Sequence, residues 1–363
     1  MEKGTFYFPG PTEIRREVME AMVRQPLPGR TQSLRDLFAS LQEGLKPVFR
    51  TERLVYVATS SGTGMMEAAV RCAPRGKILS IVGGPFAERF ARIARACERE
   101  VTQHDVAYGE VADPEEVRAL LAGDNYSAIT FVHSETSTGA LSDVKAIASV
   151  ARDAGVSVIV DSVSGIGGAP FETDAWGVDC VVSASQKAIA VPPGIAFAVI
   201  SEKFLHDAGG VPDRGMYLDF VEFETNARKN ETIATPPTSL MFALAYQLAD
   251  IAREGMEARW ARHEAMRATM EAWVVNTRES TGVDIGILAL PGSRSPTVTV
   301  VTVPERIGAP KVVEAVAARG YTIGNGYGPL RGTTFRVGHM GDHTVAGLER
   351  CLAVIAKSLH ELA

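Results

Sequence analysis

Two neighbouring stretches decide the fold: Val156-Ser-Val-Ile-Val-Asp-Ser-Val-Ser-Gly-Ile-Gly-Gly168 and Val178-Asp-Cys-Val-Val-Ser-Ala-Ser-Gln-Lys-Ala-Ile-Ala-Val-Pro-Pro-Gly194. Each begins with an apolar, β-branched run that is short enough to form a buried strand. The first run ends at Asp161, and the second is followed by Gln186 and Lys187. The Pro-Pro-Gly turn at 192–194 would stop a helix. The sequence therefore predicts two buried strands with polar residues at or just beyond their ends.

An acid at the end of one buried strand and a lysine beyond the next suit a pyridine ring that carries an aldehyde. The lysine amine would form a Schiff base with the aldehyde, and the carboxylate would keep the ring nitrogen protonated. Taken singly, each residue has a plainer explanation, because perturbed ionisable groups are a minority. Asp161 alone would cap a helix or face solvent, and Lys187 alone would lie on the surface. Other motifs have to decide between these interpretations.

The surrounding pattern predicts an α/β protein with a large, mostly parallel sheet and helices on both faces. The expected strands are 54–58, 77–82, 101–106, 128–132, 156–160, 178–182 and 195–200, and helices are expected at 13–24, 34–45, 65–72, 114–121, 143–153 and 240–252. The segment 205–234 is expected to form loops. A second α/β pattern follows, with a strand at 297–303 and helices at 309–318 and 345–362. We expect a large domain at 13–255, a small one at 256–363, and segment 1–12 near the site.

A Gly- and Ser-rich turn, Thr59-Ser-Ser-Gly-Thr-Gly64, lies between a strand and a helix. Such a turn exposes backbone N–H groups at the positive end of the helix dipole, and its small residues let an anion approach closely. The pattern therefore suggests a phosphate site at Ser61, Gly62 and Thr63. An ordinary strand–helix turn is the commoner explanation when the pattern stands alone.

Composition excludes several classes of protein. The chain has 363 residues, 46% of them apolar and 22% charged, which is ordinary for a soluble globular protein. A net charge of −6 and the lack of a basic stripe argue against a nucleic-acid partner. No apolar run approaches the ~20 residues of a membrane helix, and no signal-peptide pattern is present. Four scattered cysteines without metal-ligand spacing predict no metal site and a reducing, cytoplasmic location.

Two motifs give the chain a family resemblance. Gln186-Lys187 after a Ser-rich strand, and Glu135-Thr-Ser-Thr-Gly139 at the end of strand 128–132, resemble the class V pyridoxal-phosphate (PLP) aminotransferases. The likeness is greatest to the alanine–glyoxylate and serine–glyoxylate (serine–pyruvate) enzymes, and it covers nearly the whole chain. It implies a fold-type-one PLP transferase, PLP as cofactor and a homodimer.

The resemblance also implies roles for single residues. Lys187 would hold PLP and later act as the base, while Asp161 would pair with the ring nitrogen. The other positions implied to contact PLP are Ser61, Gly62 and Thr63 at its phosphate, Phe86 and Val163 on the ring faces, Thr136, Gln186, and Thr235 from the other subunit. Gly10 and Arg336 would bind the substrate. Arg30 stands in Gly29-Arg30 where many relatives have His-Arg, so its role stays open.

We expect transfer of an amino group from a small L-amino acid, alanine or serine, to glyoxylate or pyruvate. Aspartate or another donor is the main alternative, because a second carboxylate needs a second cation and Arg30 is the obvious candidate. A PLP-dependent lyase or desulfurase is less favoured, since Cys180 and Cys351 lie in apolar segments. A non-enzymatic binding protein is disfavoured by the presence of both Lys187 and Asp161.

Overall fold

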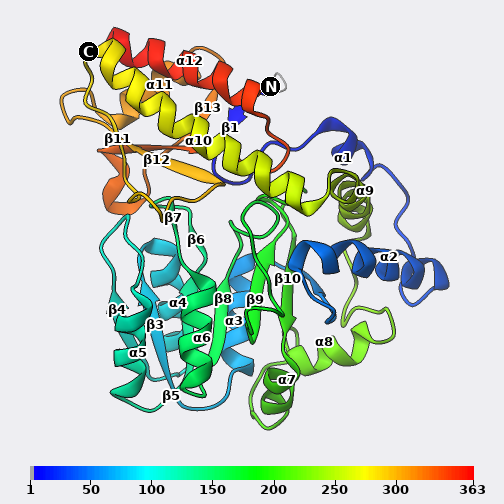
Figure 1. Ribbon diagram of the computed structural model, residues 1–363. Coiled ribbons are helices and arrows are strands. Elements are labelled where there is room, and N and C mark those ends of the chain that lie inside the picture. Colours follow the sequence, from blue (N-terminus) through cyan, green and yellow to red (C-terminus); the bar gives the residue numbers. More distant parts are fainter. Residues whose placement is uncertain (1–3) are drawn as a thin grey trace.

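The computed structural model describes residues 4–363 and contains a large and a small sheet, each flanked by helices (Figure 1). The large sheet has the strand order β2-β10-β9-β8-β5-β3-β4. Its strands are β2 (Tyr56–Thr59), β3 (Lys77–Val82), β4 (Val101–Asp105), β5 (Tyr126–Val132), β8 (Ser157–Asp161), β9 (Cys180–Ala184) and β10 (Ile195–Ile200). Only β10 runs antiparallel to its neighbours within this sheet. The predicted fold class is confirmed.

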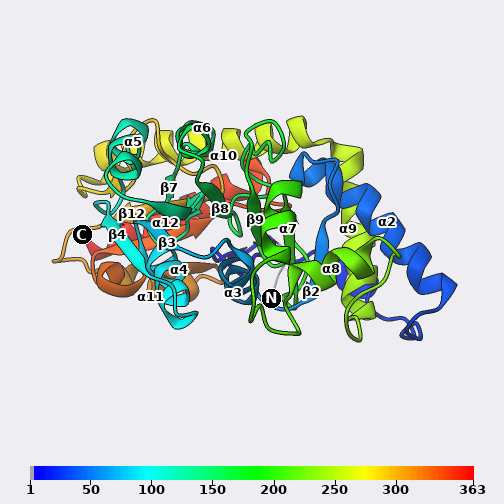
Figure 2. The same cartoon turned by 90° about the horizontal axis from the view of Figure 1, so that it is seen from below.

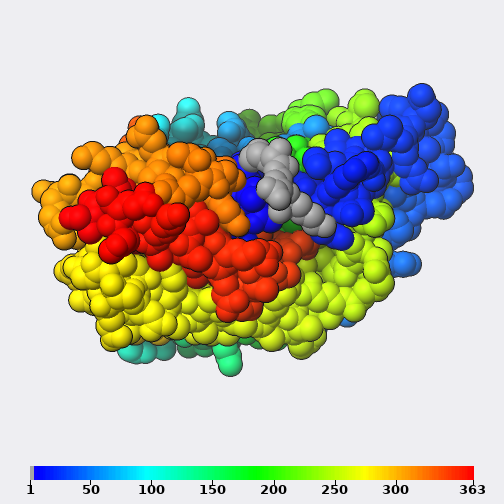
Figure 3. All heavy atoms as spheres, turned by 90° about the horizontal axis from the view of Figure 1, so that it is seen from above, coloured from blue at the N-terminus to red at the C-terminus, as the bar shows by residue number. Residues whose placement is uncertain are grey.

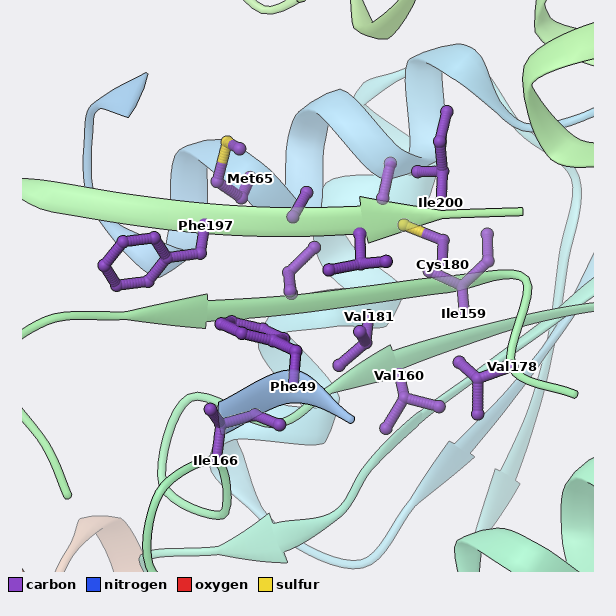
Figure 4. Packing of buried hydrophobic residues seen from close by; sticks show 14 of the residues in the cluster. Phe49, Met65, Ile159, Val160, Ile166, Val178, Cys180, Val181, Phe197 and Ile200 are labelled. Atoms are coloured by element: carbon purple, nitrogen blue, oxygen red, sulfur yellow. The ribbon is translucent and has the colours of Figure 1, made fainter. Parts of the chain in front are cut away.

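Helices cover both faces of the large sheet (Figure 2). One face carries α3 (Gly62–Cys72) and α4 (Pro85–Ala96), and the other carries α5 (Pro114–Ala122) and α6 (Val144–Asp153). Strands covered on both faces are mostly apolar, and every residue of β8, β9 and β10 is buried. Figure 4 shows this packing, with Val160 and Val181 on neighbouring strands and Phe49 and Phe197 near them.

The strand register brings the polar strand ends together at one edge of the sheet. β5 and β8 run parallel, and Val132 lies opposite Asp161. β8 and β9 are also parallel, and Asp161 lies opposite Val182. Lys187 follows β9 by three residues, so it emerges at the same edge as Asp161. In open α/β sheets this carboxyl edge is where ligands bind.

The small sheet has the order β1-β13-β14-β12-β11 and packs against the three last helices. Its strands are β1 (Phe6–Tyr7), β11 (Gly286–Ile287), β12 (Val298–Thr302), β13 (Thr322–Asn325) and β14 (Thr334–Gly338), and its helices are α10 (Met256–Thr281), α11 (Ala309–Ala317) and α12 (Val345–Leu362). Viewed from above, α10 in yellow and the orange and red C-terminal residues form one continuous surface (Figure 3). Strand β1 pairs with β13, so the chain's beginning joins a sheet made by its end.

The helix predicted at 13–24 is wrong in extent, because α1 covers only Arg16–Glu20. The Glu13 carboxylate accepts hydrogen bonds from the backbone N–H groups of Gly4 at 2.7 Å and Phe6 at 3.2 Å. The Thr12 N–H, just before this segment, donates to the Gln186 carbonyl at 2.9 Å. Long-range contacts therefore hold this segment extended up to Arg15.

The prediction of loops at 205–234 is also wrong. Two helices lie there, α7 (Glu202–Gly209) and α8 (Phe220–Ala227). Ser201 caps the first by accepting from the Phe204 N–H, and Asp219 caps the second by accepting from the Val221 N–H. The remaining long helices are α2 (Gln32–Phe49) and α9 (Thr238–Glu254). None of the helices found in residues 4–363 is both long and apolar enough to cross a membrane.

Candidate active site

A cavity of about 200 Å³ opens at the carboxyl edge of the large sheet, beside the first turns of α3 and α4. It brings together most residues that the sequence singled out. The predicted residues that line it are Ser61, Gly62, Thr63, Phe86, Thr136, Asp161, Val163, Gln186 and Lys187. These side chains come from five different segments of the chain, and the sheet topology gathers them in one place.

Lys187 lies in this cavity with its side chain almost completely buried. Its amine donates to the Pro9 carbonyl at 2.5 Å. Gly10 has φ +135°, and a Cβ there would lie 2.1 Å from Lys187 Nζ, so only glycine fits beside the amine. Burial, reinforced by Arg336, lowers the pKa of Lys187 to about 7. The amine can therefore exist unprotonated near neutral pH, as a nucleophile or base must.

Asp161 is the buried acid of the cavity and is 3% exposed. Its Oδ1 accepts from the Val163 N–H at 2.8 Å, which fixes the carboxylate at the end of β8. Burial raises the pKa of Asp161 to about 7, although the Val163 hydrogen bond and Lys187 oppose this rise. A cation placed against this carboxylate would stabilise its charged form and so offset the effect of burial on its pKa.

The first turn of α3 faces the same cavity. Ser61 is its N-cap residue, and no side chain caps the helix. Unsatisfied N–H groups at a helix start bind anions. A Cβ at Gly62 would lie 2.5 Å from Val163 Cγ2, so glycine lets the α3 turn approach Val163 closely. Anionic groups therefore fit at Ser61, Gly62 and Thr63, on the cavity wall that also contains Val163.

Arg89 lines the cavity but was not predicted from the sequence. Its guanidinium lies 5.0 Å from the centre of the Phe86 ring and donates to Thr63 Oγ1 at 3.3 Å and to the Tyr327 hydroxyl at 3.4 Å. The spacing of Phe86 and Arg89 was the sequence signal for this residue, because residues three apart on a helix lie on one face. Ser134 and Ser164 also line the cavity, and Ser164 Oγ lies 2.5 Å from Thr136 Oγ1. Neither serine was singled out from the sequence.

Arg336 lies on β14 and is 7% exposed. Its Nε donates to the Asn325 carbonyl at 2.8 Å and its Nη1 to the Thr136 carbonyl at 3.4 Å. Among residues 4–363 it forms no ion pair with a carboxylate. Arg336 does not line the cavity itself, but Thr136, which it contacts, does. A buried, unpaired guanidinium beside the cavity is suited to bind a carboxylate in two-point fashion.

Two predicted residues are not brought to this cavity within one chain. Thr235 and Arg30 both line a separate hollow of about 520 Å³, formed between the start of α2 and segment 230–236. Thr235 also lies before α9, which begins only at Thr238. Neither residue lines the cavity that contains Lys187.

The cysteines are placed away from the site. Cys72, Cys180 and Cys351 are buried and Cys97 is half-buried, and all four are free. None of them lines the cavity. Within the part of the chain that the structure describes, no group of His, Cys, Asp and Glu side chains could hold a metal ion.

Comparison with known proteins agrees with this chemistry. The family "Aminotransferase class-V" matches residues 19–316. An uncharacterized aminotransferase of Methanocaldococcus jannaschii is 37% identical over 98% of this chain and 91% of its own length. The serine–glyoxylate aminotransferase of Methylorubrum extorquens is 32% identical over 97% and 90%.

A solved structure shows the same fold over the whole chain. The aspartate aminotransferase of subgroup IV from Thermus thermophilus is 31% identical, with a TM-score of 0.89 over 99% of this chain and 100% of its own. Its name and that of the Methylorubrum relative specify different amino donors. Both names specify an aminotransferase. The chain therefore belongs to the class V aminotransferases, a family of PLP-dependent enzymes.

Proposed function

We propose that this protein binds PLP and transfers the amino group of a small L-amino acid, alanine or serine, to glyoxylate or pyruvate. One observation carries the proposal: Lys187, Asp161 and the uncapped start of α3 meet in a single cavity. A buried amine, a buried acid and an anion site are the three features that PLP's aldehyde, ring nitrogen and phosphate require.

The residues of this cavity would contact different parts of PLP. Lys187 would hold the PLP aldehyde, and Asp161 would hold the proton on the ring nitrogen. Phe86 and Val163 would cover the two faces of the ring and exclude water. Ser61, Gly62, Thr63 and Gln186 would bind at the phosphate side, with Thr136 near the ring. PLP itself supplies an electron sink for the bond that breaks at the substrate Cα.

Once the amino substrate is bound, Lys187 would move the proton between the substrate Cα and PLP carbon C4′. Its lowered pKa supports this role, because a base of pKa about 7 works well at neutral pH. Arg336 would bind the α-carboxylate, and Gly10 would let the substrate lie beside the lysine. Each of these tasks uses a group that is already positioned by hydrogen bonds or close packing.

The preference for a neutral donor rests on the placement of the two other arginines. Arg30 lines the separate hollow, and Arg89 is engaged by the hydroxyls of Thr63 and Tyr327. Arg30 therefore does not face this cavity in its own chain, and Arg89 would have to give up its two hydroxyl partners to bind a distal carboxylate. An uncompensated carboxylate in a buried site is costly, so alanine and serine should react better than aspartate and glutamate.

Aspartate is the second candidate donor, and Arg89 is the observation that favours it. Arg89 lines the cavity and forms no ion pair within residues 4–363. Its two hydroxyl partners lie at 3.3 and 3.4 Å and could be exchanged for a carboxylate. Arg89 would then be the residue that selects aspartate. Arg30 could take this role only from a second subunit.

A panel of donors decides between the two candidates. Initial rates for alanine, serine, aspartate and glutamate should be measured with glyoxylate and again with pyruvate, for the wild type, Arg89→Gln and Arg30→Ala. The proposal predicts the highest kcat/KM for alanine or serine in all three proteins. Aspartate as the best wild-type donor, with that preference lost in either variant, would overturn the small-donor proposal and identify the arginine responsible.

The homodimer is part of the same proposal, because Thr235 can contribute to a PLP site only in a second copy. Light scattering after gel filtration should give twice the monomer mass. The four free thiols are consistent with the proposed cytoplasmic location.

A further inference from the structure

The start of α4 has an unusual arrangement of backbone N–H groups. Pro85 is the first helical residue and has no N–H, and Gly84 at the N-cap has no side chain to cap the helix. The Glu88 N–H is satisfied within the turn by the Gly84 carbonyl at 2.9 Å. The N–H groups of Phe86 and Ala87 therefore need partners from outside the helix.

Glu135 supplies the partner of the Ala87 N–H from a distant part of the chain. It lies on β6 (Ser134–Glu135), 48 residues after Ala87, and is 4% exposed. Its Oε2 accepts from the Ala87 N–H at 3.0 Å. Its Oε1 accepts from the Ser137 N–H at 3.2 Å and hydroxyl at 2.5 Å. Three donors thus converge on one buried carboxylate.

Gly84 gives independent support for this contact. Its φ of 170° is extended backbone that any residue adopts, so conformation does not explain the glycine. A Cβ at this position would lie 2.6 Å from Glu135 Cδ and Cγ and 2.8 Å from Ser137 Oγ. Glycine is needed here because the carboxylate passes directly over the backbone.

We propose that Glu135 is the positioning residue that sets Phe86 against the PLP ring, an inference that rests on the proposed PLP site. Phe86 is the second residue of α4, and its ring lines the cavity with Lys187 and Asp161. A carboxylate that binds the Ala87 N–H and passes over Gly84 fixes the turn from which this ring projects. Stacking of an aromatic ring depends strongly on its distance and tilt, so a loosened turn would weaken the contact with PLP.

The segment that contains Glu135 also contacts the substrate side of the site. The carbonyl of Thr136 accepts from Arg336 Nη1, and Thr136 itself lines the cavity. The placement of Phe86 by Glu135 can nevertheless be tested apart from Arg336, because PLP binding does not involve the substrate carboxylate. Measurements on the PLP-free and PLP-loaded protein in the absence of amino acids therefore isolate the role of Glu135.

The test uses Glu135→Gln, Phe86→Leu and the double variant. Glutamine keeps the shape of the side chain but leaves one accepting oxygen for three donors. The matched control is Asp143→Asn, because Asp143 caps α6 through the Ala146 N–H at 2.9 Å and is exposed, away from the cavity. Three quantities are measured: amide hydrogen exchange of Phe86 and Ala87 without PLP, the Kd for PLP, and the visible circular dichroism of bound PLP.

In Glu135→Gln, the Phe86 and Ala87 amides should exchange about tenfold faster, and PLP should bind about fivefold to tenfold more weakly, as expected for a lost helix cap. The visible dichroism should change, since it reports the asymmetry of the ring's surroundings. The double variant should bind PLP no more weakly than the weaker single variant. Asp143→Asn should leave all three quantities unchanged.

Equal PLP affinity and dichroism in Glu135→Gln and wild type, or losses that multiply in the double variant, would overturn the inference and leave the proposed function intact. A wild-type protein that takes up no PLP would overturn the proposed function itself. If Glu135→Gln does not fold, Gly84→Ala makes the same test, because its Cβ would displace the carboxylate. It should reproduce the faster exchange and weaker PLP binding, and wild-type values would contradict the inference.

Discussion

Asp161 is held at the end of β8 by the Val163 N–H, with almost no contact with water. The change Asp161→Asn keeps the oxygen that accepts this hydrogen bond and removes only the negative charge. PLP should remain bound, but kcat should fall ~10²-fold or more, since a charge opposite the ring nitrogen is lost. Steady-state kinetics and the PLP content of the purified variant measure both effects. Unchanged turnover would show that Asp161 does not act on the ring.

Lys187 and Asp161 also predict how the stability of the PLP-free protein depends on pH. Asp161 has a pKa of about 7 in the folded state against 3.8 ordinarily, so the folded state binds more protons between these values and stability falls as pH rises toward 7. Lys187 has a pKa of about 7 against 10.5, so the unfolded state binds more protons above pH 7 and stability rises again. The two residues together favour a stability minimum near pH 7.

Thermal melting of the PLP-free wild type and Asp161→Asn across roughly pH 5 to pH 8 tests this dependence. The variant lacks the loss of stability that Asp161 causes as pH rises toward 7. The Tm of the variant minus the Tm of the wild type should therefore increase as pH increases toward 7. Glu202→Gln, a change on the exposed side of α7, serves as the control and should show no such trend. A Tm difference between Asp161→Asn and wild type that stays constant with pH would contradict the shifted pKa of Asp161.

Arg336 is the residue whose substitution should separate substrate binding from PLP binding. A carboxylate bound by a buried guanidinium contributes ~2–4 kcal/mol, so Arg336→Ala should weaken amino-acid and oxo-acid binding by roughly 30-fold or more. The Kd for PLP should barely change. Arg331, exposed on the 3₁₀ helix Gly328–Arg331, is a suitable control for substitution to alanine. Equal losses of PLP and substrate affinity would mean that Arg336 is structural.

At the scale of elements, the buried strands could be predicted from sequence because their apolar runs are short and end at turn residues. Helices α7 and α8 were missed although Ser201 and Asp219 are ordinary cap residues. Helix α1 was overestimated because contacts of Glu13 and Arg15 with distant segments override local propensity. Such contacts are not visible in the local pattern.

Helix α10 escaped prediction for a different reason. Its buried face contains Arg259 and His263 among methionines, so charged residues interrupt the apolar periodicity. Arg259 is 1% exposed and donates to the carbonyls of Gly167 at 3.0 Å and Ala188 at 2.6 Å. Ala188 follows Lys187 directly, so α10 supports the backbone of the lysine from the small-sheet side.

Arg259→Met should therefore destabilise the protein strongly. The change removes one of the two arginine partners of Glu254, at 2.8 Å, and of Asp342, at 3.1 Å, and leaves two buried carbonyls unpaired. Loss of one member of a buried charge network typically costs ~3–5 kcal/mol. Urea denaturation measures this loss, and Arg253→Met, at a site 74% exposed, should cost less than about 1 kcal/mol. Similar midpoints for both variants would contradict the structural role of Arg259.

At the scale of the whole molecule, the site lies where three parts of the chain meet. The N-terminal segment contributes the Pro9 carbonyl, the large sheet contributes Lys187, and the small sheet contributes Arg336. The motif residues in the large sheet could be predicted because they follow strands that end at one edge. Arg89 was missed although it lies three residues after Phe86 on α4, because its contact with Tyr327, 238 residues away in the sequence, is not visible in the local pattern.

The central claim is that Lys187 is the residue that holds PLP. Treatment of the PLP-loaded protein with sodium borohydride fixes the cofactor to its amine, and peptide mass spectrometry then locates it. The label should appear on the peptide that contains Lys187, disappear in Lys187→Ala, and persist in Lys203→Ala, which removes an exposed lysine of α7. A label on any other lysine of the wild type, or none after loading with PLP, would contradict the account.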